Sequence, residues 1–408
     1  MRSVIFSLLL FCFLFANGKY LSPIPLPKSY FIDLDIYPCD SYCLQEHLKN
    51  GEIFSFLAKA SPNNIGKLQK EYQKFAALFD ISSFLPTQTL HITILSSKVL
   101  APYTNTIIKS LNAYLVRKGI SYQIETKIYD QPSQIQEFID QAYQSDLIIL
   151  PLSFDQKEIL STLSSTVPIF VPTLHKSFIP QTSPLIFFGG VDYIDQLDKL
   201  LRLAQNKVAI FYLKQSALSQ KLTDHLLQQS NILAKTYPID KTASNLKGYF
   251  KNHYELNHFS IVLNTPLVKT ALILSQLTLY DIHPKNKLST QINYSPKLFT
   301  LTQPRDRENF LLASCIDRLD PKAEAMLEAF DLNPSFDWLT YAISVGSDIF
   351  FSRRYGFRRE SHENIEKEQI RYNTKIWRSK EFSFVPIAVP VQTLEGDVPD
   401  GAHAYIPK

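Results

Sequence analysis

The chain has 408 residues, of which 45% are hydrophobic and 20% are charged, a composition that excludes a disordered or collagen-like chain. Its net charge is only +4, and no basic stripe is dense enough to contact nucleic acid, so that class of partner is excluded too. With 11 glycines the chain has little material for phosphate-binding loops, and its length predicts two or three domains.

Residues 1–18 have the pattern of an export signal. Arg2 supplies a positive start, Val4–Phe15 is an apolar run, and Ala16–Gly18 places small residues at a cleavage site. The apolar run is shorter than the roughly 20 residues that span a bilayer. We therefore expect a periplasmic chain that does not span the membrane after signal cleavage; a retained anchor is the alternative.

Residues 19–88 are expected to form an N-terminal helical extension. The alternation at Ile32–Ile36 predicts a short strand, and apolar residues at helical spacing predict helices over Leu44–Lys59 and Lys67–Phe79. Helices of this kind pack against a body or a partner rather than carry chemistry.

Cys39 and Cys43 lie in this extension, four residues apart. Residues at that spacing in a regular helix have Cβ atoms about 5–6 Å apart, more than the roughly 3.5–4.5 Å of a disulfide. A bridge therefore requires a turn, which Pro38 and Asp40 permit. A disulfide is the preferred prediction for an exported chain, with two free thiols or a metal site as alternatives. No zinc-like spacing is present, so no metal and no cofactor are predicted, and Cys315 is expected to be buried.

From Thr89 the chain alternates between strands and helices. In residues 89–205, the first predicted lobe, the strands are His91–Leu95, Tyr122–Tyr129, Leu147–Leu150, Ile169–Val171 and Leu185–Phe188. The helices are Tyr103–Arg117, Ser133–Tyr143, Lys157–Ser164 and Val191–Gln205. Continuous apolar strands between helices indicate a parallel sheet that is covered on both faces.

The same architecture repeats in residues 206–303. The predicted strands are Lys207–Leu213, Ile232–Tyr237 and Ser260–Leu263, with Leu298–Leu301 closing the series, and the helices are Leu218–Gln229, Leu246–Lys251 and Val268–Gln276. The fold class is therefore α/β, with two tandem open parallel-sheet lobes that face a cleft.

Residues 304–352 are predicted to hold two helices that return to the hinge, Ala323–Phe330 and Phe336–Phe351. Residues 353–408 are expected to form a basic, partly disordered tail, with six arginines and three lysines against four glutamates up to residue 380. Ile370–Ile376 alternates like an edge strand. Two interpretations of the tail stay open: a surface that binds a protein of the cell envelope, or a solvated loop of Arg–Glu pairs.

Four segments carry a resemblance to a known family: KVAIFYL followed by Gln215 and Ser216, LIILPLS at Leu147–Ser153, IVLNTP at Ile261–Pro266, and the helix TYAISVGSDIFF at Thr340–Phe351. Together they resemble the type I periplasmic binding protein fold, and the last segment is similar to its penicillin-binding-protein activator branch. The resemblance spans about Leu90 to Phe351. It implies two lobes joined by crossing strands, with ligand contacts at strand ends. The extension, the tail and the missing acidic-plus-Arg pattern of amino-acid receptors depart from it.

Polar residues recur where the predicted strands end, which is where open α/β sheets bind ligands. A small polar ligand is the expected partner, and capping of the following helices is the alternative use of the same residue types. The candidate ligand-binding residues are Ser96, Ser97, Ser153, Thr173, His175, Asp192, Tyr193, Gln215, Ser216, Asn264, Thr265, Gln291 and Asn293.

Catalysis has little support, because the sequence contains no HExxH motif, no GxSxG motif and no cysteine nucleophile with a partner. We therefore expect a non-catalytic protein. Two functions compete: a receptor or sensor that closes on a small polar ligand, and an envelope scaffold or activator of a cell-wall enzyme that binds no small ligand. The polar segment Leu288–Arg307 fits either a cleft wall or a hydrogen-bonded connection between the lobes.

Overall fold

The computed structural model describes residues 37–79, 89–179, 181–205, 207–229, 232–355 and 357–388, and the strand predicted at Ile32–Ile36 lies outside them. The chain divides into two compact units, residues 1–88 and 89–408. Among the described residues no helix has the length and apolarity to cross a membrane. The first unit contains α2 (Ser41–Lys49), α3 (Ile53–Lys59), η1 (Gly66–Leu68) and α4 (Gln69–Leu78).

The first unit has its own small core, built from Leu44 on α2, Phe56 on α3 and Tyr72 on α4, each at most 2% exposed. The single helix predicted over Leu44–Lys59 is in fact two helices. The chain turns between them at Gly51, which has φ +76°, a conformation that favours glycine.

Cys39 and Cys43 form a disulfide, with their Cα atoms 5.4 Å apart. The required turn is the start of α2: Asp40 is the N-cap and accepts hydrogen bonds from the backbone N–H groups of Tyr42 and Cys43, so Cys39 precedes the helix. His47 Nε2 lies 3.6 Å from Cys43 Sγ, but the disulfide leaves no thiolate at this cluster for a metal.

Protein that begins at Lys19, denatured without reductant, should show one titratable thiol, that of Cys315. After reduction the same chain should show three, because Cys12 is absent from it. In the native state Cys315 should react slowly, since burial raises the pKa of its thiol. Titration with a thiol reagent measures all three states, and three thiols before reduction would contradict the bridge.

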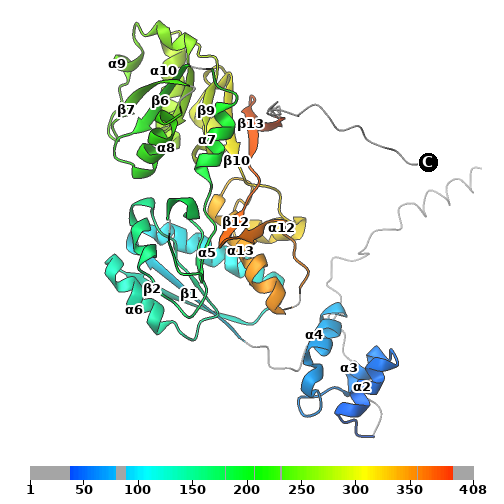
Figure 1. The fold of residues 1–408 in the computed structure, drawn as a ribbon. Coiled ribbons are helices and arrows are strands. Elements are labelled where there is room, and N and C mark those ends of the chain that lie inside the picture. The colour runs from blue at the N-terminus through cyan, green and yellow to red at the C-terminus, as the bar shows by residue number, and fades with distance from the viewer. Residues whose placement is uncertain are drawn as a thin grey trace, which may run out of the picture. The chain divides into compact units, whose positions relative to one another are not determined.

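The first lobe of the second unit contains a seven-stranded sheet in the order β11-β12-β5-β4-β3-β1-β2 (Figure 1). All its strand pairs are parallel except β11 with β12. The strands are β1 (Leu90–Ser97), β2 (Tyr122–Tyr129), β3 (Leu147–Ile149), β4 (Ile169–Val171), β5 (Ile186–Phe188), β11 (Asn364–Glu366) and β12 (Gln369–Arg371). The helices are η2 (Lys98–Leu100), α5 (Ala101–Arg117), η3 (Pro132–Gln134), α6 (Ile135–Gln141), η4 (Phe154–Ser161), η5 (Lys176–Phe178), α12 (Pro321–Ala329) and α13 (Trp338–Tyr355).

The second lobe has a sheet of the same size, in the order β14-β13-β10-β9-β8-β6-β7. Its strands are β6 (Lys207–Leu213), β7 (Leu233–Ile239), β8 (Ser260–Asn264), β9 (Lys287–Ser289), β10 (Phe310–Ser314), β13 (Lys375–Ser379) and β14 (Phe384–Ile387). Its helices are α7 (Tyr193–Leu201), α8 (Ala217–Leu227), α9 (Lys247–Phe250), η6 (Tyr254–His258), α10 (Leu267–Leu279), η7 (Gln291–Asn293), α11 (Lys297–Leu301) and η8 (Pro304–Arg307). The two-lobe α/β prediction is therefore confirmed.

The chain crosses between the lobes three times, at Gly189–Asp192, Cys315–Asp320 and Tyr372–Thr374. The first crossing precedes the boundary predicted at residue 205, because Leu197 and Leu200 of α7 pack with β6 of the second lobe. The second lobe also extends past residue 303. Leu298–Leu301 is a helix rather than its closing strand, and β9 and β10 take that place.

Residues 364–387 are strands of the body rather than the basic tail that the charge pattern predicts. β11 and β12 extend the first sheet, and β13 pairs antiparallel with β10 of the second. The alternation at Ile370–Ile376 thus belongs to two strands in different lobes, and both isoleucines are buried. Several tail charges are paired within the fold: Glu360 with Arg117 and Lys118, and Glu366 with Arg371.

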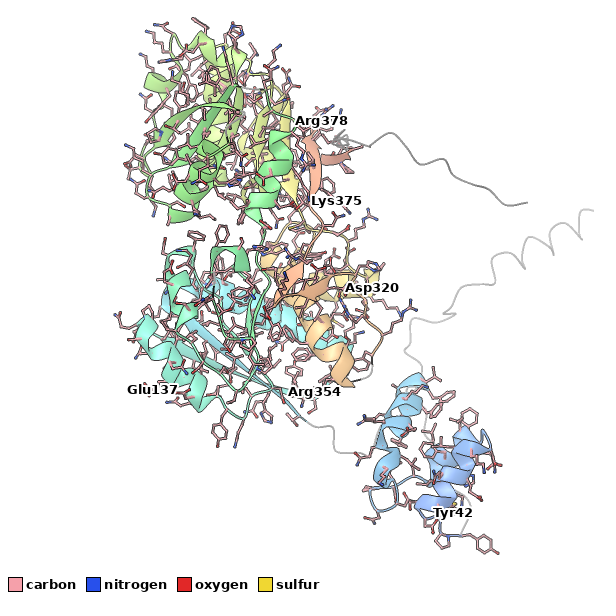
Figure 2. The ribbon with its side chains drawn as sticks, viewed as in Figure 1. Tyr42, Glu137, Asp320, Arg354, Lys375 and Arg378 are labelled. Atoms are coloured by element: carbon pink, nitrogen blue, oxygen red, sulfur yellow. A yellow bond between two sulfur atoms is a disulfide. The ribbon has the colours of Figure 1, made fainter. Side chains whose placement is uncertain are left out.

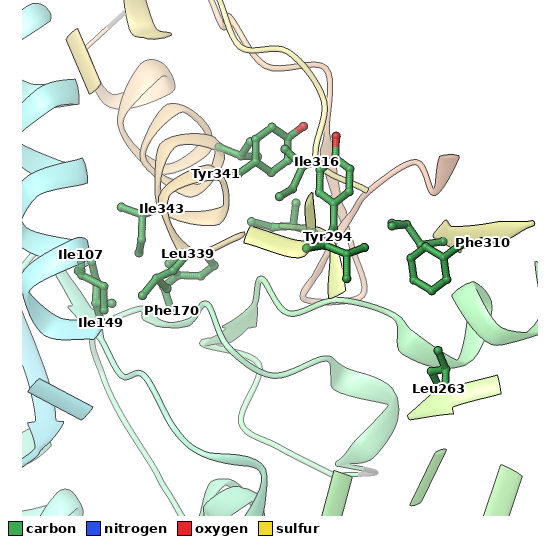
Figure 3. Close-up of a cluster of buried hydrophobic side chains, with 14 of the residues drawn as sticks. Ile107, Ile149, Phe170, Leu263, Tyr294, Phe310, Ile316, Leu339, Tyr341 and Ile343 are labelled. Atoms are coloured by element: carbon green, nitrogen blue, oxygen red, sulfur yellow. The ribbon is translucent and has the colours of Figure 1, made fainter. Parts of the chain in front are cut away.

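Alternate residues of each central strand enter different cores, as two-sided sheets require. One apolar cluster continues through both lobes, and Figure 3 shows Ile149 and Phe170 of the first lobe, Leu263 of the second, and Leu339 on α13 in this cluster. The Phe170 ring is close to Gly346 of α13: an added Cβ there would lie 2.6 Å from a ring carbon. The two lobes therefore share one apolar core, and α13 packs closely on β4 of the first.

Candidate functional site

The structure places the thirteen candidate residues at or just beyond the carboxyl ends of strands. In the first lobe they follow β1, β3, β4 and β5, and in the second lobe they follow β6, β8 and β9. This is the edge at which parallel α/β sheets present ligand contacts. The hydrogen bonds of these residues divide them into two groups. Some already have partners within the fold, and others have buried polar atoms that make no hydrogen bond within the described chain.

Three first-lobe candidates stabilise their own loops. Ser153 is the N-cap of η4 and forms a capping box with Gln156. The Thr173 hydroxyl accepts from Leu152 N–H at 2.9 Å and donates to Leu152 C=O at 2.7 Å, which joins the loops after β3 and β4. Ser96 is buried and accepts from the Thr104 hydroxyl at 2.7 Å, whereas Ser97 is half-buried at the end of β1.

Three second-lobe candidates also have local partners. Ser216 is the N-cap of α8 and accepts from Ser219 N–H. Gln215 is exposed and donates to Asp240 Oδ2 at 2.9 Å, so it fixes the loop after β7. The hydroxyl groups of Thr265 and Thr270 lie 2.7 Å apart.

The remaining second-lobe candidates are buried and keep unused hydrogen-bonding capacity. Asn264 Oδ1, Asn293 Oδ1 and Gln291 Nε2 have no hydrogen-bond partner among the described residues, and neither does the neighbouring Thr290 Oγ1. A buried polar atom without a partner costs about 1–3 kcal/mol. These atoms at the ends of β8 and β9 would therefore gain from a bound polar molecule.

Gln291 also binds the start of the second crossing and α7 of its own lobe. Its Oε1 accepts from the backbone N–H of Cys315 at 2.8 Å, in the second crossing, and from Gln196 Nε2 on α7 at 3.3 Å. Its own N–H donates to Gln196 Oε1 at 2.9 Å. Gln291 is the residue of the polar segment Leu288–Arg307 that links the second crossing to α7 beside the hinge.

Two candidates, His175 and Asp192, lie together in a cavity of about 180 Å³ at the hinge. We call it the hinge pocket. All three crossings contribute to its wall. The lining residues are His175, Gly190, Asp192, Asp195, Lys199, Cys315, Ile370, Arg371, Tyr372 and Thr374.

The hinge pocket carries charges of both signs. His175 Nε2 lies 3.5 Å from Asp192 Oδ2, and Asp192 is also the N-cap of α7. Asp195 Oδ2 accepts from Lys199 Nζ and from the Thr374 hydroxyl, both at 2.8 Å. The second of these bonds connects α7 with the third crossing.

Burial lowers the pKa of His175, although the neighbouring Asp192 acts in the opposite direction. The imidazole is 6% exposed, and its Nδ1 lies 2.8 Å from the Ser177 hydroxyl. Tyr372 Oη, also in the pocket wall, is buried and has no hydrogen-bond partner in the described part of the chain. A polar ligand in the pocket would meet both side chains.

Eight residues of the pocket wall are absent from the candidates: Gly190, Asp195, Lys199, Cys315, Ile370, Arg371, Tyr372 and Thr374. Asp195 and Lys199 follow Asp192 directly on α7 as an i,i+4 ion pair, a signal the sequence does contain. Arg371 belongs to a strand that pairs with β5, some 180 residues earlier in the chain, and no local pattern places it there. Tyr193 is half-buried at the start of α7, outside the pocket lining.

No protein-family model matches the sequence, and no curated protein matches it. Solved structures do match the fold. The branched-chain amino acid transporter substrate-binding protein LivJ from Streptococcus pneumoniae, in complex with isoleucine, has a TM-score of 0.55 at 11% identity, over 74% of this chain and all of that one. A branched-chain amino acid ABC transporter periplasmic ligand-binding protein from Burkholderia xenovorans has a TM-score of 0.57 at 8% identity, over 74% of this chain and 95% of that one. The leucine-binding protein LivK from Thermotoga maritima has a TM-score of 0.51 at 12% identity, over 74% and 98%. Residues 89–388 thus have the two-lobe fold of the type I periplasmic binding proteins.

Proposed function

We propose that this chain is an exported, non-catalytic receptor or sensor that binds a small polar ligand between its lobes, with the hinge pocket as the enclosed part of the site. One observation carries the proposal. The pocket wall combines His175, on the loop after β4 of the first lobe, with residues of all three crossings.

A ligand at this position would bias the angle between the lobes. Opening or closing of two lobes changes backbone torsions in the segments that connect them. Gly190, Cys315 and Thr374 each belong to one of those segments, and all three line the pocket. A molecule that contacts them in one arrangement of the lobes would stabilise that arrangement by its differential affinity.

The pocket chemistry favours a small molecule with groups of both charges. Asp192 and Asp195 could pair with cationic groups of a ligand, and Lys199 and Arg371 could pair with its anionic groups. The volume of about 180 Å³ is below the roughly 300–1,000 Å³ of drug-sized ligand sites. Small zwitterions are therefore the first class to test, before sugars, nucleosides and peptidoglycan fragments.

Thermal-shift screening of these four classes tests the proposal. A ligand at a hundredfold excess over its Kd should stabilise the protein by about 2.7 kcal/mol. Asp192→Asn and Arg371→Gln should each reduce that shift, because each removes one charge from the pocket wall. Gln215→Ala, at an exposed strand end outside the pocket, is the matched control and should keep it.

A flat response across all four classes would favour the second candidate, an envelope scaffold or activator that works through protein contacts. A specific observation supports that candidate: the first unit exposes large apolar side chains, among them Tyr42 at 68% and Leu78 at 69%. Exposed apolar surface of this kind is typical of protein-binding sites. Under this alternative, loss of residues 19–88 should abolish partner binding and leave the unfolding of the second unit unchanged.

A further inference from the structure

A second cavity lies in the first lobe, enclosed by the helices α5, α12 and α13 and by the chain on either side of β11 and β12. Its volume is about 450 Å³, which is within the range of small-molecule sites. Figure 1 shows the three helices side by side, and Figure 2 labels Asp320, the N-cap of α12. We call it the lateral cavity; it shares Arg371 with the hinge pocket.

Asp348 of α13 is a buried carboxylate in its wall, with a side chain that is 4% exposed. Its Oδ2 accepts hydrogen bonds from Glu360 N–H and Ser361 N–H, both at 2.9 Å, and from the Ser361 hydroxyl at 2.7 Å. Arg359 Nε lies 3.8 Å from the same oxygen. The other oxygen, Oδ1, has no hydrogen-bond partner among the described residues.

Two side chains of α5 bring further unused groups to the same wall. Tyr114 is 4% exposed, and burial together with the facing Asp348 carboxylate raises the pKa of its hydroxyl, which makes no hydrogen bond of ordinary length in the described chain. Arg117 gives both terminal nitrogens to Glu360, at 2.8 and 2.6 Å, while its Nε stays without a partner in the described structure. The cavity thus offers a carboxylate oxygen, a hydroxyl and an N–H donor.

The balance of charge decides which ligands fit. Five carboxylates and three arginines line the cavity. Arg117 and Glu360 neutralise each other, Asp317 pairs with Lys375 at 2.6 Å, and Arg371 pairs with Glu366 at 3.3 Å. Asp320, Asp348 and Glu363 are the carboxylates of the wall that remain against Arg318. A phosphate or carboxylate would meet Asp348 in a buried setting, where repulsion between like charges is strong. A cation would instead supply the donor that Asp348 Oδ1 lacks.

We propose that the lateral cavity binds a small organic cation: a primary ammonium group held by Asp348 and Tyr114, with an oxygen elsewhere in the molecule that accepts from Arg117 Nε. Ala113, Leu319, Ala323, Leu327 and Val345 supply an apolar wall for the carbon chain between these groups. Asp317 and Leu319 belong to the second crossing, so this ligand would also contact a segment that joins the lobes.

Ligand-observed NMR titration of the full chain tests the proposal with aminopentanol, which carries an amine and a hydroxyl at opposite ends of five carbons. Pentanediol and hydroxypentanoate are its neutral and anionic counterparts. Aminopentanol should bind, and the other two should bind at least about thirtyfold more weakly, the usual effect of losing one partner of a buried charge pair. Equal binding of all three compounds, or preference for the anion, would overturn the proposal.

Two variants separate this site from the hinge pocket. Asp348→Asn should weaken aminopentanol binding by at least about thirtyfold, and Ala323→Leu should abolish it by filling the cavity from α12. Asp348→Asn also alters the bonds to Glu360 and Ser361, so circular dichroism checks that this variant is folded. If Asp348→Asn unfolds, the binding measured with Ala323→Leu tests the proposal instead. Asp192→Asn in the hinge pocket should leave the titration unchanged. Undiminished binding in folded Ala323→Leu protein would overturn the proposal.

Discussion

A chain that ends at Tyr355 should fail to form the two-lobe body. The truncation removes β11 to β14, and with them the buried side chains of Ile370 and Ile376. It also removes two partners of the buried Arg307 guanidinium, whose Nε donates to the Ser379 hydroxyl and whose Nη2 donates to Glu381 C=O. Burial of each isoleucine contributes about 1.5–3 kcal/mol, and each lost partner of a buried group costs about 1–3 kcal/mol. The total is comparable to the roughly 5–15 kcal/mol stability of a domain. Circular dichroism during heating should show no cooperative transition from the second unit.

The control ends at Ala388 and keeps every strand that the structure describes. It should unfold at the temperature of the full chain, and its lobes should resist protease. If the chain that ends at Tyr355 behaves in the same way, the C-terminal strands are dispensable and the interpretation as a partner-binding tail regains its support. The two truncations differ only in residues 356–388, so the comparison isolates the contribution of these strands.

The sequence predicts several strands of both lobes closely, because each is either a continuous apolar run or, at the sheet edge formed by β2, a regular alternation of polar and apolar residues. Tyr122–Tyr129, Ile169–Val171 and Lys207–Leu213 have their predicted bounds in the structure. Local pattern fails where partners are distant in the chain. β12 is three residues long and lies in the sheet because it pairs with β5, and the charged residues around it resemble a solvated loop.

The same limit applies to the site. Strand ends are visible in the sequence, so His175 and Asp192 could be selected from it. The crossings are visible only in the fold, and Arg371, Tyr372 and Thr374 reach the hinge pocket through the third one. Helix capping explains several of the other candidates, since serine at a strand end is also a preferred N-cap, as Ser153 and Ser216 are here.

Gly190→Ala should destabilise the second unit by about 3 kcal/mol and abolish ligand binding at the hinge pocket, because overpacking against backbone has no flexible side chain to absorb it. A Cβ at Gly190 would lie less than 3.0 Å from backbone atoms of Leu174 and His175. Gly190 N–H also donates to Leu174 C=O at 2.9 Å, so the two segments cannot separate without losing that bond. Relief of the clash must move the loop that carries His175, which is part of the pocket wall. Urea denaturation measures the stability, and the thermal shift with a hinge-pocket ligand measures the binding.

Gly248→Ala is the matched control for this substitution. Gly248 lies in α9, and an added Cβ would meet nothing within 4 Å. Alanine there should be neutral or should stabilise the protein by up to about 1 kcal/mol, the difference between the two residues in a helix. Both variants add one methyl group to the second unit, so a difference in their stability reports the different surroundings of the two glycines. A Gly190→Ala protein with the denaturation midpoint and ligand response of Gly248→Ala would show that the loop at His175 moves freely. In that case the hinge pocket would be too compliant to hold a small ligand in one orientation, and the receptor proposal would lose its structural basis.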